Sequence, residues 1–159
     1  MLTVLAVDAS SVSDWTREGP LSDELRKLVD ALRDNHVIVS AVLWQQGEAD
    51  ALAGVSREQY AASLGLLIRR LREGGISAPV LLARSTRCRT AGSDNIRDGV
   101  ALVVAREANV FLGPDTDVFG NALRRDGCHF NDAGLGLAAE AWREVLRQHA
   151  IVPLPLRYS

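Results

Sequence analysis

Two side chains able to move protons lie three positions apart near the end of the chain, Asp126 and His129. A histidine can take a proton from a hydroxyl group and return it to a leaving alcohol, because its ordinary pKa lies near neutral pH. A carboxylate on the other ring nitrogen fixes the tautomer and stabilises the imidazolium. The pair stands at the entrance of the last expected helix, so it is interpreted as the acid–base half of a hydrolytic triad. A histidine that only caps this helix is the alternative.

A second polar cluster, Trp44-Gln45-Gln46-Gly47-Glu48, ends an apolar segment. The side-chain amide of Gln46 could donate a hydrogen bond to the oxyanion of a tetrahedral intermediate, beside a backbone N–H from the turn at Ser10 and Ser11. We expect Glu48 to orient the loop by accepting hydrogen bonds. The competing interpretation is a polar loop that satisfies its own backbone.

The remaining candidates for this site carry weaker signals. Trp15 and Trp44 could wall a sugar pocket by ring stacking, and single tryptophans equally often pack in a core. Ser10 and Ser11 are candidates for the nucleophile by their position after a strand alone, and each also suits a turn. The chain therefore has no obvious nucleophile.

Other charged clusters give no firm chemistry. Asp115 and Asp117 follow a proline, a context more typical of a turn than of a metal site. Arg84, Arg87 and Arg89 could contact an acidic sugar, although a solvated loop is favoured. No Cys/His spacing matches a structural zinc site, and we expect neither a metal nor a cofactor.

The elements that position these residues alternate between strands and helices. Apolar, β-branched runs predict four strands, at Leu2–Val7, Val37–Leu43, Pro79–Ala83 and Val110–Leu112. Four β–α units imply a parallel sheet covered by helices on both faces. Ligands bind beyond the C-terminal ends of such strands, so the polar segments 8–15, 44–50, 84–89 and 113–130 should share one rim.

Helix boundaries carry clear sequence signals. A helix should begin at Ser22, and a second begins with the capping box of Ser56 and Gln59 and ends at Gly74-Gly75. A third should start near Asp94, and the last should start after Asn131-Asp132.

Length and composition fit one domain over residues 1–150, followed by an extended tail over 151–159. The 159 residues carry a net charge of −2, which gives no basic surface for nucleic acid. No apolar run approaches the ~20 residues of a membrane span. The N-terminus is too short for a signal peptide, so a cytoplasmic location is the default, with secretion possible if a preceding segment is missing.

The two cysteines, Cys88 and Cys128, are expected to be reduced thiols in this default compartment. Both follow predicted strands at the same rim, so a disulfide is geometrically conceivable.

Three segments resemble blocks of one family. Trp44–Asp50 resembles the Trp-x-Gln-Gly-Glu block of the sialate O-acetylesterase and acetylxylan-esterase branch of the SGNH hydrolases, and Asp126–Phe130 is similar to the closing Asp-x-x-His block. Ala6–Trp15 resembles the second block of that family. The resemblance implies a three-layer α/β fold of flavodoxin-like architecture. It also implies a Ser/His/Asp mechanism acting on O-acetyl or similar short acyl groups of a carbohydrate.

The chain departs from the family at the nucleophile. Members carry the serine in Gly-Gln-Ser-Asn or Gly-Asp-Ser on a first strand in the middle of the sheet, and nothing here matches it. A missing N-terminal fragment is favoured over a rearranged domain in which the turn at Asp8–Ser11 takes its place. We therefore expect a homodimer, a complementing N-terminal fragment, or direct pairing of Leu2–Val7 with Val37–Leu43.

The favoured function is a carbohydrate O-acetylesterase whose partner is a small acylated sugar. The alternative is a degenerate, non-catalytic domain for carbohydrate binding or assembly. A serine hydroxyl within ~3.2 Å of the His129 ring distinguishes the two. A nucleotide-binding domain would need a glycine-rich loop after the first strand, and Asp8–Ser11 is not one.

Overall fold

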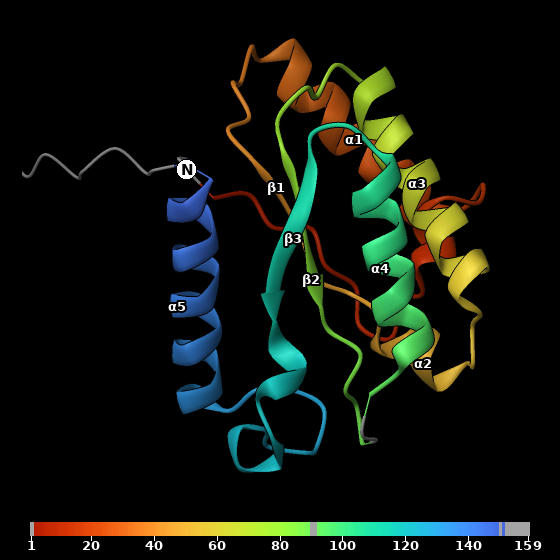
Figure 1. The fold of residues 1–159 in the computed structure, drawn as a ribbon. Helices are drawn as coiled ribbons and strands as arrows, with labels where there is room; N and C mark the ends of the chain where they lie inside the picture. The colour runs from red at the N-terminus through yellow and green to blue at the C-terminus, as the bar shows by residue number, and fades with distance from the viewer. Residues whose placement is uncertain (1, 90–91, 150, 152–159) are drawn as a thin grey trace, which may run out of the picture.

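The computed structural model describes residues 2–89, 92–149 and 151 of the chain. Its centre is a parallel sheet of three strands in the order β1-β2-β3 (Figure 1). The strands are β1 (Val42–Trp44), β2 (Val80–Arg84) and β3 (Val110–Asp115). β2 pairs with both neighbours, so β1 and β3 are the two edges of this sheet.

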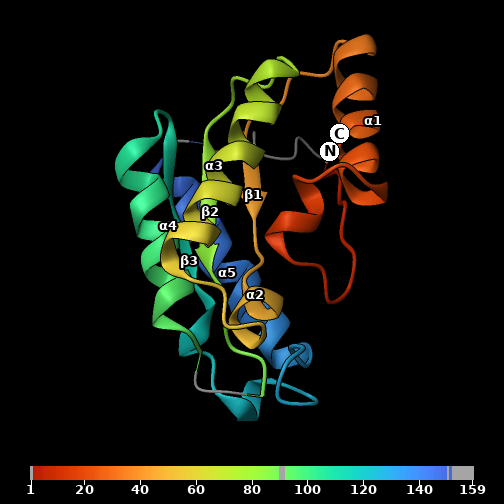
Figure 2. The same ribbon diagram turned by 90° about the vertical axis from the view of Figure 1, so that its right-hand side faces the viewer.

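Helices lie on both faces of the sheet, which confirms the predicted three-layer α/β class. The helices α3 (Arg57–Glu73) and α4 (Asp94–Arg106) pack together on one side, and α5 (Asp132–Gln148) lies on the other (Figure 1). The helix α1 (Pro20–Asp34) lies beside β1 and packs on the end of α3 (Figure 2). Two short elements, the 3-10 turn η1 (Val12–Trp15) and α2 (Glu48–Leu52), flank the rim.

The helix boundaries follow the caps that the sequence predicts. Ser56 Oγ accepts from the backbone N of Gln59, and Gln59 Oε1 accepts from the backbone N of Ser56, so both bonds of the predicted capping box are present. Asn131 accepts from the backbone N of Gly134 and caps α5. Helix α1 begins at Pro20, two residues earlier than predicted, because proline suits the first helical position.

The main core lies between the sheet and the α3–α4 layer. It contains fully buried side chains from both layers, among them Tyr60, Leu64, Leu82, Ile96 and Val100. Burying each large aliphatic side chain is worth roughly 1.5–3 kcal/mol, so this half of the domain holds much of its stability.

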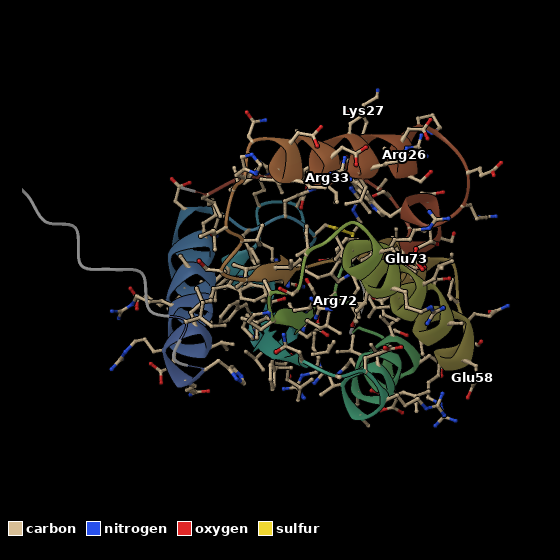
Figure 3. The ribbon with its side chains drawn as sticks, turned by 90° about the horizontal axis from the view of Figure 1, so that it is seen from above. Arg26, Lys27, Arg33, Glu58, Arg72 and Glu73 are labelled. Atoms are coloured by element: carbon tan, nitrogen blue, oxygen red, sulfur yellow. A yellow bond between two sulfur atoms is a disulfide. The ribbon has the colours of Figure 1, made fainter. Side chains whose placement is uncertain are left out.

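The outer face of α1 is polar. Its cations Arg26, Lys27 and Arg33 are exposed, and Lys27 projects away from the body of the protein (Figure 3). Each pairs with an acid three residues earlier, at Asp23, Glu24 and Asp30 respectively. Such exposed pairs are worth only about 0.3–0.5 kcal/mol each.

The first predicted strand, Leu2–Val7, is wrong. This segment forms no strand, and its apolar side chains are exposed, with Leu2 at 79% and Val4 at 73%. A strand needs a neighbouring strand for its backbone hydrogen bonds, and this segment has none. The expected direct pairing of Leu2–Val7 with Val37–Leu43 is therefore absent from the described residues.

The second predicted strand, Val37–Leu43, is shorter than expected. Only Val42–Trp44 pairs, and it pairs on one side, with β2. Residues 37–41 belong to no strand, and Ile38 is exposed. The predicted strand is therefore confirmed only at Val42 and Leu43, because β1 has a single neighbouring strand among the described residues.

The expectation of two reduced thiols is also wrong, because Cys88 and Cys128 form a disulfide. Cys88 follows β2 and Cys128 precedes α5, and the fold brings both to the same rim. The predicted position of both cysteines at one rim was therefore a better guide than the expectation of reduced thiols in a cytoplasmic protein.

The predicted tail over 151–159 lies outside the described residues except for Ile151. Over the described part of the chain, none of the helices combines the length and apolarity that crossing a membrane requires.

Candidate active site

Asp126 and His129 lie side by side in the turn before α5. His129 Nδ1 is 2.7 Å from Asp126 Oδ2, and Asp126 Oδ1 accepts from the backbone N of Cys128 (2.9 Å) and of His129 (2.7 Å). The bond from the imidazole, followed by these backbone bonds, holds the pKa of Asp126 far below its usual range. The same carboxylate raises the pKa of His129 above its ordinary value. The structure thus brings the two predicted residues together, and their catalytic role stays a prediction.

The other ring nitrogen of His129 faces the N-terminal segment. Its Nε2 is 3.5 Å from Asp8 Oδ1, and the histidine side chain is 45% exposed. Asp8 adds a smaller contribution to the raised pKa of His129. The sequence placed Asp8 on the rim but gave no signal for this contact, because the two residues lie at opposite ends of the chain. Within residues 2–89, 92–149 and 151, no serine hydroxyl is hydrogen-bonded to the ring.

The two candidate nucleophiles are engaged in the turn that they form. Ser10 Oγ donates to the carbonyl of Val7 (2.8 Å) and accepts from Trp15 Nε1 (3.0 Å). Ser11 Oγ donates to Asp14 Oδ2 (2.7 Å), which also accepts from the backbone N of Ser11 (2.8 Å). These bonds build η1, as expected of turn serines.

Gln46 lies beside this turn and connects it to α2. Its Nε2 donates to the carbonyl of Ser10 (3.0 Å) and to Asp50 Oδ2 (2.6 Å), and buried Asp50 also accepts from the backbone N of Val12 (2.9 Å). Both hydrogens of the amide are therefore in use. The role of oxyanion donor stays a prediction, and it requires Gln46 to release one of these bonds.

Glu48 begins α2 and is partly buried. It accepts a hydrogen bond from Ser85 Oγ at 2.6 Å, and its burial raises the pKa of the carboxyl group. The preceding Gly47 lets the turn approach β2, since a Cβ there would stand 2.6 Å from the carbonyl oxygen of Ser85. This arrangement suits a residue that orients its loop. Ser85 escaped prediction because nothing in its local sequence indicates a partner 37 positions away.

The two tryptophans pack against each other. The rings of Trp15 and Trp44 meet edge to face, 6.1 Å between centroids, and both join the main core. Trp15 is 4% exposed and presents no ring face to a sugar in this structure. The core alternative therefore describes Trp15, while a sugar contact stays a prediction for the half-buried Trp44.

The carboxylates after β3 are bound by arginine and backbone. Asp115 pairs with Arg97 (2.6 Å) and Arg84 (3.4 Å). Asp117 accepts from Thr86 at both its backbone N and its Oγ1 (2.7 Å each), and from Arg97 (2.9 Å). We call Thr86, Arg97, Asp115 and Asp117 the rim network. Arg97 and Thr86 were not predicted, and no group of three metal-ligating side chains occurs among the described residues.

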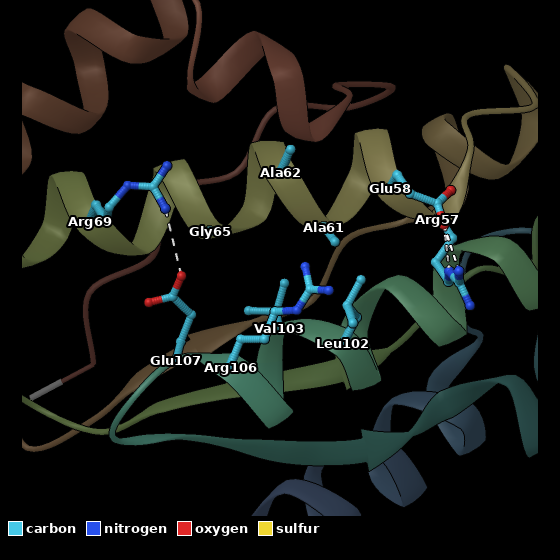
Figure 4. A pocket seen from close by; sticks show the side chains of 10 residues that line it. All are labelled: Arg57, Glu58, Ala61, Ala62, Gly65, Arg69, Leu102, Val103, Arg106 and Glu107. Atoms are coloured by element: carbon cyan, nitrogen blue, oxygen red, sulfur yellow. Dashed lines mark hydrogen bonds and ion pairs between the residues drawn. The ribbon is translucent and has the colours of Figure 1, made fainter.

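A groove of about 440 Å³ lies between α3 and α4 (Figure 4). Small side chains, Ala61, Ala62 and Gly65, form part of its wall, and Arg69 pairs with Glu107 across it at 3.6 Å. None of the predicted site residues lines this groove.

The α/β sheet and the Asp126–His129 pair in the turn before α5 fit the family that the sequence resembles. The family model described as "Carbohydrate esterase, sialic acid-specific acetylesterase" matches residues 1–141, and the chain belongs to this family. Most of the described chain, including both polar clusters, lies inside the match.

Three solved structures with the same fold have low sequence identity to this chain. A carbohydrate esterase of family 3 from Talaromyces cellulolyticus superposes with a TM-score of 0.66 at 14% identity, covering 91% of this chain and 70% of that one. An acetyl esterase solved with an acetate ion gives 0.66 at 14%, covering 89% and 68%. A protein from Arabidopsis thaliana gives 0.62 at 24%, covering 83% and 56%. Among curated protein sequences, none matches the chain significantly.

Proposed function

We propose that this domain serves an esterase that removes O-acetyl or similar short acyl groups from a carbohydrate by a Ser/His/Asp mechanism. The observation that carries the proposal is the 2.7 Å contact between His129 Nδ1 and Asp126 Oδ2, which leaves Nε2, 3.5 Å from Asp8 Oδ1, as the nitrogen for proton transfer. Membership of the acetylesterase family supplies the ester and carbohydrate class.

In this mechanism His129 moves protons through Nε2. It takes the proton of a serine hydroxyl as the serine attacks the acyl carbon, and it returns the proton to the leaving sugar oxygen. Asp126 keeps the Nδ1 proton in place and stabilises the imidazolium. The active form is neutral imidazole, and the raised pKa of His129 places the acidic limb of the rate profile above pH 6.5.

The proposed nucleophile comes from a strand that adds to the outer edge of β1, where none of the described residues forms a strand. Support comes from Leu43, whose side chain is 37% exposed in the middle of β1, and from Leu5 and Val7, which are also exposed. A strand between β1 and the N-terminal segment would cover these side chains and give β1 a second neighbour. A fragment carrying Gly-x-Ser is our preferred occupant over a second copy of this chain.

A second candidate function is a degenerate domain that binds a carbohydrate or assists assembly without turnover. One observation favours it: in the described part of the chain, the contacts of the His129 ring are with the carboxylates Asp126 and Asp8, not with a hydroxyl.

The deciding experiment measures release of acetate from acetylated sugars and from 4-nitrophenyl acetate. The chain alone should be a feeble esterase, and addition of an N-terminal fragment bearing Gly-x-Ser should raise the rate. His129→Ala should abolish the gain, because no other described group holds the acid–base position.

The matched control is His36→Asn, which changes an exposed histidine at the end of α1. Asparagine tolerates its positive φ of 54°, so activity should be unchanged. Robust turnover by the chain alone that disappears in Ser10→Ala or Ser11→Ala would instead assign the nucleophile to the turn. No turnover with any fragment, together with sugar binding, would establish the binding domain.

A further inference from the structure

We propose that the Cys88–Cys128 disulfide positions the Asp126–His129 pair and makes the site redox-sensitive, so that reduction of the bridge releases the turn that carries the pair. The expected change in rate rests on the proposed function. The expected change in the pKa of His129 rests on the contacts of the turn alone.

One end of the bridge is fixed to the interior. Cys88 is buried, and the residues just before it are bound to Asp117, which accepts from the backbone N of Thr86 (2.7 Å) and of Arg87 (2.9 Å). Asp117 is itself held by Arg97 from α4 at 2.9 Å. Cys88 is therefore attached to a buried, charge-assisted network that joins β2, α4 and the end of β3.

The other end lies in the exposed turn that carries the pair. We call residues 125–129 the histidine turn, which is closed by a bond from the backbone N of Arg125 to the carbonyl of His129 (2.9 Å). Asp126 and His129 are both exposed at the surface. Cys128 directly precedes His129, and its backbone N donates to Asp126 Oδ1. The disulfide therefore restrains both Asp126 and His129 through Cys128.

Two non-covalent contacts reach the same part of the turn. The backbone N of Arg89 donates to the carbonyl of Gly127 (2.8 Å), and the buried guanidinium of Arg124 donates to the carbonyl of Cys128. Because Arg89 is next to Cys88, the bond from Arg89 to Gly127 also requires the loop after β2 to lie against the histidine turn. Arg124 directly precedes the histidine turn and pairs with Phe130 on its other side, so it should keep the reduced turn partly ordered.

The redox step balances with a dithiol reductant. One thiolate of the reductant attacks Cys128 Sγ, the more exposed half-cystine, and Cys88 leaves as a thiolate. The second thiol of the reductant then displaces Cys128, the reductant leaves as its disulfide, and both cysteines take up protons. Two electrons pass to the protein. The bond persists in oxidising compartments and is lost in reducing ones, so the same chain would be more active outside a reducing cytosol.

The test uses the folded chain with labelled histidine and follows the pKa of the His129 ring by NMR, oxidised and after dithiothreitol. Two carboxylates face this ring, Asp126 from its own turn and Asp8 from the N-terminal segment. On reduction the pKa of His129 should fall toward its ordinary value as the Asp126 contact loosens. In the presence of the Gly-x-Ser fragment, kcat/KM should fall about 10- to 100-fold.

The matched control is the double variant Cys88→Ser/Cys128→Ser, which should show the reduced values with and without dithiothreitol. Asp126→Asn in the oxidised chain gives the pKa of a ring without its partner. An unchanged His129 pKa in a folded, reduced chain overturns the proposal. Loss of the far-UV circular dichroism on reduction also overturns it, since the bridge would then hold the whole fold. A shifted pKa with no hydrolysis in either state supports the positioning role and refutes the esterase.

Discussion

The two sides of the rim differ in how they are held. Between β2 and β3, Asp117 and Thr86 are buried, and both oxygens of the Asp117 carboxylate accept hydrogen bonds from the protein. On the other side, β1 is three residues long and pairs with one strand among the described residues, and the histidine turn, which the Cys88–Cys128 disulfide joins to the loop after β2, is exposed. The side that stabilises the domain therefore contains no proposed catalytic group, and the side with the proposed chemistry has little packing of its own. Stability and activity should respond to different substitutions.

The largest expected effect is on activity. Asp126→Asn keeps the shape of the turn but removes the charge that fixes the His129 tautomer, so kcat/KM of the complemented enzyme should fall on the order of 10³-fold, about 4 kcal/mol. Its acidic limb should move to lower pH, because the carboxylate is what raises the pKa of His129. The free energy of unfolding should barely change, as measured in urea. A large loss of stability would break the separation between the two sides.

The largest expected effect on stability lies in the rim network. Asp117→Ala leaves three donors of Thr86 and Arg87 without their acceptor, while Arg97 keeps Asp115, and should cost about 3–4 kcal/mol of unfolding free energy. Asp98→Ala changes an exposed acid on α4 and should stay within about 0.5 kcal/mol. Equal losses of unfolding free energy in the two variants would show that the rim network stabilises the protein no more than an exposed acid does.

The two strands provide a matched pair of leucines. Leu82→Ala empties a fully buried position in β2 and should cost about 3 kcal/mol, whereas Leu43→Ala in β1 should cost less than about 1 kcal/mol. Urea unfolding of the two variants measures the difference. In the presence of a strand that covers β1, the cost of Leu43→Ala should rise, which turns this comparison into an assay for the partner.

The smallest effect is expected on α1. Arg26→Ala breaks an exposed pair with Asp23 and should change the unfolding free energy by less than about 0.5 kcal/mol, with activity unaffected. A larger change in thermal unfolding would mean that this polar face packs against something.

The helices were predictable because their signals are local. Ser56 with Gln59, and Asn131 before the last helix, mark boundaries within a few residues, and the structure follows them. The strand at Leu2–Val7 failed because strand formation depends on a neighbour that apolar periodicity does not report. The same limit applies to the site. Asp126 and His129 are three residues apart and were found, whereas the contact with Asp8 and the Cys88–Cys128 bridge join distant segments, and the sequence left them open or pointed the other way.

The bare edge of β1 also sets up a competition in solution. Its unpaired backbone groups and exposed Leu43 offer a place for any extended chain, and the exposed segment 2–7 of another molecule is one such chain. Pairing between copies grows with protein concentration, while productive pairing grows with the concentration of the complementing strand. A preparation kept concentrated without that strand should therefore lose recoverable activity through self-association, and dilution before mixing should restore it.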